Sequence, residues 1–379
     1  MLVTRPDTHA YGNAILNMAW SFRLARELEA ALCVAPLAPE RLAALTTLEC
    51  DGVRRVDAGA VMARAARGMA RLSRLGWPWP RVVGTLAELG PQGRGSDSDR
   101  GYFGLDFRHL AAASGLPVRL SSREAEAVAP VAERLGLLDA RIVTLHVREA
   151  GHAAARGVQD RDKDTARNAR IGTYRDAVDW LVARGYRVVR IGDPTMTPVA
   201  RPGLVDLATT PGRTLALELW CVLRSAFLVA SDSGPFNLSV LTGVPSLGVN
   251  ITHLLGAYPL RSHDRMILKH VTDTGTGRRL SLGEMLTPGH MKFRWAPGRF
   301  HFEDNTPGEI LAAVEEMAEI VEGRAGSPSA DQQRGRQAIV DFLDGDWGRR
   351  KQKGAPFYPG DGFFGAAFAA ASLGGAAHG

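Results

Sequence analysis

Hydrophobic and polar positions follow two different patterns along the chain, and the change falls near residue 140. Beyond that point, short apolar runs typical of buried strands alternate with amphipathic segments typical of helices. The strands are predicted at residues 141–147, 186–192, 226–231 and 245–250, and the helices between them at 173–185, 213–225 and 235–243. Regular alternation with short connections predicts a parallel sheet with helices on both faces.

The first 125 residues show a mixed helical pattern rich in Ala and Arg. Apolar residues recur at helical spacing over residues 14–31, which predicts an amphipathic helix before a strand-like run at 32–36. Residues 90–100 have the Gly, Ser and Asp content of a loop. The second half of the chain closes with a long helix predicted at 305–323, which starts with a capping signal.

The length of 379 residues exceeds the usual size of a single hydrophobic core, so two domains are expected. The predicted fold class is α/β, with a first domain over residues 1–130 and a second over 138–322. Residues 323–379 are expected to hold one more helix, at 333–345, and a flexible tail that is poorly ordered at its end.

The composition is that of an ordinary globular protein, with 45% apolar and 23% charged residues. No apolar run is long enough to cross a bilayer, and the N-terminus lacks the pattern of a signal peptide. Cys33, Cys50 and Cys221 have no metal-binding spacing and are expected to be reduced core residues. These features predict a cytoplasmic protein without a nucleic-acid partner. The net charge of +6 suits a phosphorylated ligand or an anionic membrane surface.

Unusual polar residues gather in three segments that each follow a predicted strand. The carboxyl ends of parallel strands meet at one edge of the sheet, where ligands bind in such folds. In the first segment, His146 and Arg148 lie on the same side as the strand ends. A guanidinium there offers a rigid fork of donors suited to a phosphate. The alternative is an arginine paired with a carboxylate of its own domain.

The second segment contains Arg190, Gly192 and Asp193. Gly192 would let the backbone approach a ligand closely, and Asp193 could accept hydrogen bonds from a ribose or a base. Strand-Gly-Asp-Pro is also a common turn, which is the alternative.

The third segment runs from Asp232 through Ser233 and Gly234 to Pro235, which is expected in the first turn of a helix. Free backbone N–H groups and the positive end of that helix would form a cradle for a phosphate. Alternatively, Asp232 or Ser233 serves only as the N-cap of the helix.

Four segments together resemble a bacterial family of surface-carbohydrate glycosyltransferases: TLHVREAG, RNARIGTYRDAVDWLVARGYRVVRIGD, ASDSGPFNL and FEDNTPGEILAAVEEM. More distantly, the His-x-Arg at 146–148 is similar to O-fucosyltransferases. The Asp-Ser-Gly-Pro at 232–235 is similar to the lipopolysaccharide heptosyltransferases. The resemblance covers residues 140–320, and the first domain matches poorly.

The resemblance implies a GT-B-like fold, with two Rossmann-like domains facing a cleft and a nucleotide-sugar donor held by the second domain. Arg148 would neutralise the donor diphosphate, with His146 supporting it. Heptosyltransferases usually have a histidine where Asn237 stands, so the sugar stays open. The predicted donor-binding residues are His146, Arg148, Asn168, Arg190, Gly192, Asp193, Asp232, Ser233, Gly234, Pro235 and Asn237.

Glycosyl transfer releases a nucleoside diphosphate, whose developing charge needs stabilisation. The chain offers no Asp-x-Asp metal site in a suitable loop, and the charged segment 160–164 is interpreted as a solvated loop. Arg148 and the helix end are therefore predicted to act without a metal. The acceptor hydroxyl needs a base, for which Asp7 and His9 are the candidates, with a structural turn as the alternative.

The predicted function is a metal-independent glycosyltransferase that moves a hexosyl or deoxyhexosyl group to a surface-glycan or lipid-linked acceptor. The nucleotide-sugar is a substrate, no cofactor is expected, and a GDP-sugar is favoured by the His-x-Arg resemblance. The alternatives are a nucleotide-sugar epimerase and a non-catalytic nucleotide- or glycan-binding relative.

Residues 61–81 contain no acidic residue and end near two tryptophans, Trp77 and Trp79. Their arginines recur at helical spacing on one face: Arg64, Arg67, Arg71 and Arg74. An arginine stripe of this kind suits anionic lipid, which predicts a peripheral contact with the inner face of the cytoplasmic membrane. The alternative is a first-domain helix whose arginines are simply solvated.

Overall fold

The computed structural model describes residues 2–4, 11–34, 43–56, 115–151, 162–254, 259–346 and 360–373. The predicted base residues Asp7 and His9 lie outside the described residues, as do the arginine stripe at 61–81 and the loop at 90–100.

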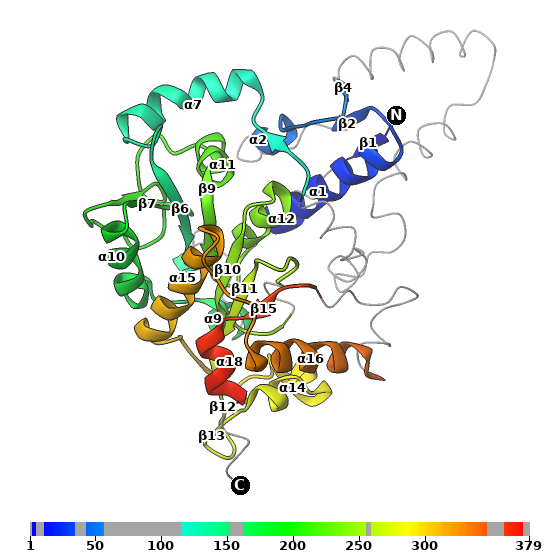
Figure 1. The fold of residues 1–379 in the computed structure, drawn as a ribbon, viewed down its shortest axis with the longest axis vertical. Coiled ribbons are helices and arrows are strands. Elements are labelled where there is room, and N and C mark those ends of the chain that lie inside the picture. Colours follow the sequence, from blue (N-terminus) through cyan, green and yellow to red (C-terminus); the bar gives the residue numbers. More distant parts are fainter. Residues whose placement is uncertain are drawn as a thin grey trace, which may run out of the picture.

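The second half of the chain is built on a seven-stranded sheet in which every neighbouring pair is parallel (Figure 1). Its strands, in spatial order, are β15 (Phe363–Phe364), β11 (Arg265–Leu268), β10 (Ser246–Ile251), β9 (Ser225–Ala230), β6 (Arg141–His146), β7 (Tyr186–Arg190) and β8 (Leu204–Asp206). The predicted α/β class and its parallel sheet are confirmed.

We number the six strands from β6 to β11 as they occur in the chain. Read across the sheet from β8, they then stand in the order 3-2-1-4-5-6. This is the doubly wound order of dinucleotide-binding folds, in which the direction of winding reverses between the first and fourth strands. The reversal lies between β6 and β9. Loops leaving the carboxyl ends of these two strands therefore border the crevice where such folds bind ligands.

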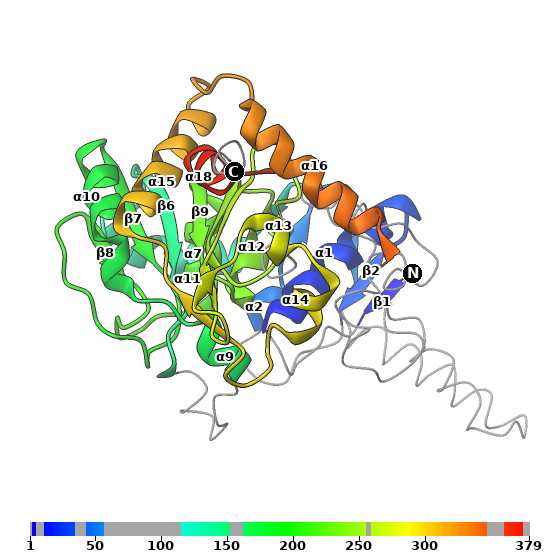
Figure 2. The same ribbon diagram turned by 90° about the horizontal axis from the view of Figure 1, so that it is seen from below.

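Helices cover both faces of this sheet (Figure 2). On one face, α10 (Arg175–Ala183), preceded by the short η2 (Ile171–Tyr174), packs against α15 (Pro307–Val321). On the other face, α11 (Leu215–Leu223) packs against α7 (Ser122–Arg134) and α12 (Leu238–Thr242).

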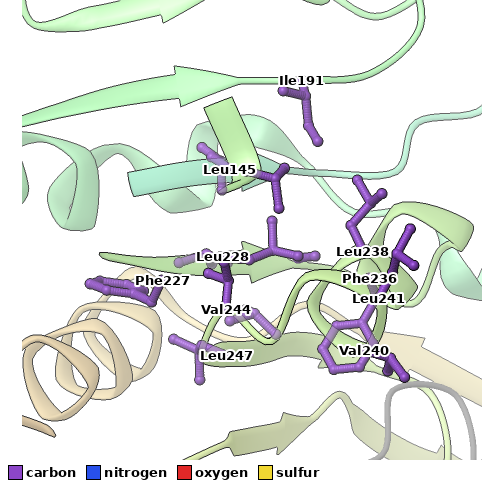
Figure 3. Packing of buried hydrophobic residues seen from close by; sticks show 14 of the residues in the cluster. Leu145, Ile191, Phe227, Leu228, Phe236, Leu238, Val240, Leu241, Val244 and Leu247 are labelled. Atoms are coloured by element: carbon purple, nitrogen blue, oxygen red, sulfur yellow. The ribbon is translucent and has the colours of Figure 1, made fainter. Parts of the chain in front are cut away.

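The core of the domain forms where apolar strand residues meet these helices (Figure 3). Leu145, Leu228 and Leu247 come from three neighbouring strands, and Phe236 and Leu241 come from the segment after β9. These strands are apolar nearly throughout because the sheet is covered on both faces.

The beginning of the chain contributes a second, three-stranded parallel sheet of β1 (Leu2–Thr4), β2 (Leu32–Val34) and β4 (Arg55–Val56). Helix α1 (Tyr11–Glu27) connects its first two strands and corresponds to the helix predicted at 14–31. The short α2 (Ala43–Thr46) follows, and β3 (Glu49–Cys50) pairs with β5 (Val118–Arg119).

Residues 270–303 form a small antiparallel sheet that the sequence pattern did not predict. Its strands are β12 (His270–Asp273), β13 (Arg278–Arg279) and β14 (Phe300–Glu303), with α13 (Leu282–Met285) and α14 (Pro288–Phe293) between the last two. This insertion stands between β11 and α15, at the carboxyl edge of the large sheet.

The C-terminal segment 360–373 differs from the flexible tail that was predicted. Phe364 is fully buried in β15, and α18 (Ala366–Leu373) packs against α15 and α16 (Ala330–Asp344). The amide of Gln332 donates to the Phe364 carbonyl at 2.8 Å. Apolar side chains in a short, glycine-flanked run were enough to add a strand to the sheet edge.

The three cysteines are buried and unbridged, as predicted. Among the described residues, no helix combines the length and the apolar character needed to cross a bilayer.

Candidate functional site

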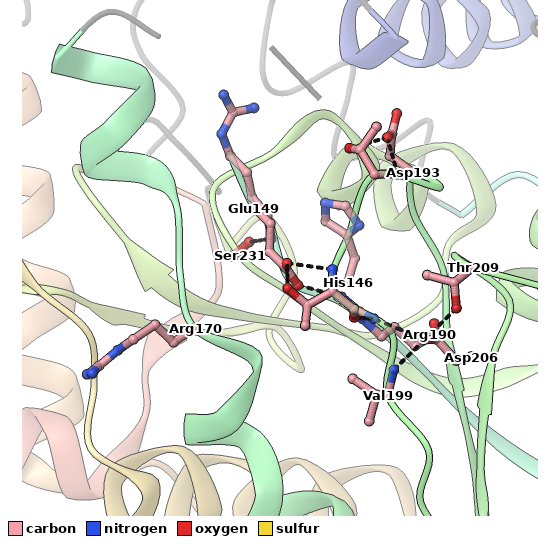
Figure 4. A network of polar contacts seen from close by, with 12 residues as sticks. His146, Glu149, Arg170, Arg190, Asp193, Val199, Asp206, Thr209 and Ser231 are labelled. Atoms are coloured by element: carbon pink, nitrogen blue, oxygen red, sulfur yellow. Dashed lines mark hydrogen bonds and ion pairs between the residues drawn. The ribbon is translucent and has the colours of Figure 1, made fainter. Parts of the chain in front are cut away.

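The loops after β6 and β9 are bonded to each other at the reversal point of the sheet (Figure 4). The Arg148 N–H donates to the Ser231 hydroxyl at 2.7 Å, and the Ser231 N–H donates to the His146 carbonyl at 3.0 Å. The Arg148 carbonyl accepts a hydrogen bond from the Ala169 N–H at 2.9 Å. The backbone of Arg148 is thus fixed on both sides, while its side chain is partly exposed.

His146 is buried beneath these loops, with 3% of its surface exposed. Its Nδ1 lies 3.2 Å from the carbonyl of Ile191, which follows β7. The ring therefore links the first and second strand-end loops, and its support of Arg148 stays a prediction.

Asp232 is a buried carboxylate that organises its neighbours. The Thr252 hydroxyl donates to it, and the Arg167 Nε donates to its Oδ1 at 3.1 Å and to its carbonyl at 3.0 Å. Burial would raise the pKa of Asp232, but the nearby Arg167 and His253 and these hydrogen bonds outweigh it, so the pKa lies below its ordinary value. Asp232 thereby holds Arg167 at the ligand edge of the sheet. The sequence did not single out Arg167.

Ser233 and Gly234 meet the first domain. Gly234 opens the short helix η3 (Gly234–Asn237), with Pro235 in its first turn as predicted. A Cβ on Gly12 of α1 would lie 2.9 Å from the Gly234 Cα, so the two backbones touch. The Asn237 Nδ2 donates to the Gly12 carbonyl at 3.2 Å. Gly234 and Asn237, predicted as donor contacts, therefore hold η3 against α1 at this seam.

Ser233 stands at the N-cap position of η3, as the alternative for the third segment had it, but its side chain makes no capping hydrogen bond. The beginnings of α1 and η3 face each other across the seam instead. Helix N-termini carry partial positive charge, which adds to that of Arg148 and Arg167 nearby.

Arg190 occupies a different place from the one predicted. Its side chain is fully buried, with 0% exposed, and it pairs with Glu149 at 2.5 Å and Asp206 at 3.2 Å. It also donates to the Thr197 carbonyl at 2.7 Å. Figure 4 shows it behind the strand-end loops, so the predicted donor contact is replaced by a supporting role.

Gly192 and Asp193 form the turn that was the alternative for the second segment. Gly192 has a φ of 151°, and a Cβ there would lie 2.5 Å from the Met196 sulfur. The Asp193 carboxylate accepts from the N–H and the hydroxyl of Thr195, at 2.9 and 2.6 Å. The positive φ favours glycine here, because the end of the flexible Met196 side chain could move away from a Cβ.

Glu218 is a site residue that the sequence did not reveal. It lies one turn into α11, is 7% exposed, and accepts from the Gly192 N–H at 3.3 Å and from Arg213 at 3.0 Å. Burial raises its pKa to about 7, even though Arg213 opposes this shift. Tyr11 lies beside it at the seam, and among the described residues the buried Tyr11 hydroxyl has no hydrogen-bond partner. Buried carboxylates with raised pKa values gather at functional sites.

The raised pKa predicts a pH-dependent stability. Between an ordinary value of 4.5 and the folded value of about 7, the folded protein keeps a proton on Glu218 that the unfolded chain releases. The contribution is complete below pH 4.5 and is lost as pH rises to about 7. The free energy of unfolding should fall by up to about 1.4 kcal/mol per pH unit relative to a Glu218→Gln variant. Urea unfolding of both proteins across this range measures the difference; a constant difference would contradict the assignment.

Asn168, the remaining predicted donor contact, lies apart from the seam. It lines a cavity of about 1000 Å³ on the α10 and α15 side of the strand ends, and its carbonyl accepts from Lys269 at 2.6 Å. The cavity shares Glu149 with the strand-end loops but does not include Arg148, Ser233 or Gly234.

No family model matches the sequence, and no curated protein matches it. Among solved structures, the chain is similar to a glycosyl transferase of family 9 from Veillonella parvula, with a TM-score of 0.48 and 12% identity over 84% of this chain and 97% of that one. It is similar to the E. coli ADP-heptose heptosyltransferase II, with a TM-score of 0.38 and 14% identity over 65% and 84%.

The chain is also similar to TibC, an iron-containing dodecameric glycosyltransferase from E. coli, with a TM-score of 0.31 and 14% identity over 65% of this chain and 57% of that one. In the part of this chain that the structure describes, no three His, Cys, Asp or Glu side chains are grouped to hold a metal ion. All three of these structures are of glycosyltransferases.

Proposed function

We propose that the protein is a glycosyltransferase whose nucleotide-sugar donor binds where the two domains meet. The observation that carries this is the pair of cross-bonded loops at the reversal point, one holding Arg148 and the other placing Gly234 against α1. In doubly wound sheets this crevice is the general ligand site.

The charge at this edge suits a diphosphate. Arg148 is fixed through its backbone, and Arg167 is held by the ionised Asp232. The beginning of the 17-residue helix α1 adds partial positive charge from the first domain. Preorganised cations stabilise the charge that develops on a departing nucleoside diphosphate.

In the proposed reaction, an acceptor hydroxyl attacks the anomeric carbon of the sugar as the bond to the diphosphate oxygen breaks. The electron pair leaves with the diphosphate, and the hydroxyl proton passes to a base. Asp7 and His9 remain the proposed bases, because they precede Tyr11 at the seam by only four and two residues.

The proposal retains the predicted donor, acceptor, membrane contact and domain bounds. The donor is a GDP-linked hexose or deoxyhexose, and the acceptor is a surface or lipid-linked glycan that the arginine-rich segment 61–81 approaches at the membrane. The first domain spans 1–130, and the second extends from 138 to 322 with the strand and helix of 360–373 added to it.

Melting temperatures in the presence of GDP, UDP, ADP, CMP and dTDP test the donor site. A nucleotide at a hundred times its dissociation constant should stabilise the protein by about 2.7 kcal/mol, and GDP is expected to do so. The Arg148→Ala variant should lose this stabilisation. The absence of a shift with all five nucleotides would contradict the donor site.

Transfer is expected to survive EDTA, because arginines and a helix end supply the positive charge in the proposed mechanism. The rate should be unchanged within error after dialysis against the chelator. Strict dependence on added Mn²⁺ or Mg²⁺ would contradict the metal-independent mechanism and point to segment 160–164, whose residues 162–164 begin a helix (Asp162–Arg167) and do not form the predicted loop.

A further inference from the structure

The cavity of about 1000 Å³ lies at the same edge of the sheet as the strand-end loops but on their other side. The antiparallel insertion walls it on one side, and the segment joining α9 (Asp162–Arg167) to η2 walls it on the other. Figure 4 shows Arg170, which lines the cavity, well apart from Asp193 and directed away from it. We propose that this cavity is a carbohydrate-binding site, separate from the phosphate-binding loops.

The charges in the cavity largely neutralise one another. Lys269 is 3% exposed and pairs with Asp304 at 2.7 Å, and the His270 Nε2 lies 2.9 Å from Glu309. Asp304 also accepts from the Arg170 N–H at 2.8 Å. Glu149 is paired with the buried Arg190. A highly charged ligand such as a diphosphate would have no excess of opposite charge to meet here, which favours a neutral ligand.

Hydrogen-bond donors stand beside groups that can accept in the rest of the cavity lining. Arg279 and His301 are exposed on neighbouring parts of the insertion, and Thr197 reaches the cavity from the loop after β7. Sugar hydroxyls donate and accept in turn, so such a mixed lining can satisfy several of them at once.

One wall of the cavity is aromatic. Phe302 lines it from β14, and its ring stacks on Trp295 with centroids 5.9 Å apart and planes inclined by 30°. Because Trp295 holds the ring, Phe302 presents a firm apolar surface beside polar groups. The C–H face of a pyranose needs such a surface, while its hydroxyl rim needs the polar side chains around it. The volume is that of a site for a drug-sized ligand or larger.

Within the proposed function, the occupant is a segment of the acceptor or product glycan. This identification rests on glycosyl transfer being the activity; the carbohydrate specificity rests only on the cavity. The glycan would then be held by the second domain, close to the Glu149 that follows Arg148 in the chain.

Saturation-transfer NMR on the full chain tests the proposal. The probes are D-glucose, D-galactose, D-mannose, L-fucose, L-rhamnose, maltose and lactose, each with and without guanosine. Saturation transfer to at least one sugar is expected, and guanosine should not displace that sugar. The proposal would be overturned if no sugar showed saturation transfer, or if guanosine displaced the sugar that does.

Two pairs of variants locate the site. A Cβ on Gly172 meets nothing within 4 Å, so Gly172→Trp is chosen to add bulk at the cavity lining, whereas Gly283→Trp adds the same bulk at an open position outside it. Arg279→Ala removes a lining residue, and Arg278→Ala removes its exposed neighbour, which pairs with Glu284 instead. Gly172→Trp should abolish saturation transfer to the sugar. Arg279→Ala should weaken sugar binding about tenfold, or about 1.4 kcal/mol.

The two control variants should bind like the wild type, and equal binding by Gly172→Trp and Gly283→Trp would overturn the proposal. Arg148→Ala separates this site from the donor site, since it should lose nucleotide stabilisation and keep sugar binding. Sugar binding without any nucleotide binding would refute the proposed function and leave the carbohydrate site standing.

Discussion

Replacing Arg148 by alanine is expected to lower the rate of sugar transfer by a factor of about 10²–10³, the cost of removing one preorganised charge-stabilising donor. The variant should fold normally, because the hydrogen bonds that fix residue 148 to Ser231 and Ala169 use only its backbone. Steady-state kinetics with the preferred donor measure the loss, and far-ultraviolet circular dichroism checks the fold.

Arg148→Lys should recover only part of the rate, because an ammonium retains the charge but not the planar fork that binds two phosphate oxygens. Arg175→Ala, at an exposed position on α10, is the matched control and should transfer at the wild-type rate. Normal transfer by Arg148→Ala would remove this residue from the mechanism.

Arg190→Met should lower the free energy of unfolding by about 3–5 kcal/mol, because it leaves two carboxylates without their buried partner. Those carboxylates, on Glu149 and Asp206, are 15% and 9% exposed. Glu149 also accepts from the Thr197 N–H at 2.8 Å, so its loss of orientation would loosen the loops after both β6 and β7. Urea unfolding at constant pH measures the change.

Arg187→Met provides the control, because Arg187 lies on the same strand but is only partly buried. It should change stability far less. If Arg190 instead contacted the donor, its variant would lose nucleotide binding and keep its stability, and that result would contradict the role inferred from burial.

Much of the second domain could be predicted because its signals are local. Apolar runs such as 141–147 and 226–231 are continuous where a strand is covered on both faces, and glycines such as Gly185 end the helices between them. From this alternation the parallel sheet and its ligand edge follow without knowledge of any long-range contact.

The insertion at 270–303 and the strand at 363–364 could not be predicted in the same way. Strands of two to four residues carry too few positions for a period to show, and β14 and β15 pair with strands that are distant in sequence. Tertiary contacts decide them, such as the amide of Gln332 that binds the Phe364 carbonyl.

The structure brings the predicted strand-end loops together, while the roles of their residues stay predictions. Arg148, Asp232 and Gly234 do meet at the strand ends, but Gly234 is needed for the approach of Gly12, more than two hundred residues away in the chain. Arg190 and Glu218 owe their roles to burial, and a single sequence does not show which charged residues are buried. An acidic residue inside the apolar helix pattern at 213–225 was the one local signal for Glu218.

Release of nucleoside diphosphate from nucleotide-sugars tests the central claim most directly. Each of the GDP-, UDP-, ADP- and dTDP-linked sugars is incubated with the wild type and with Arg148→Ala, and free nucleoside diphosphate is measured by chromatography. The account predicts release from one nucleotide class, with GDP favoured, in proportion to the wild-type concentration and about 10²–10³-fold less with the variant. Nucleotide binding without release at any protein concentration would contradict it and identify a non-catalytic binding protein.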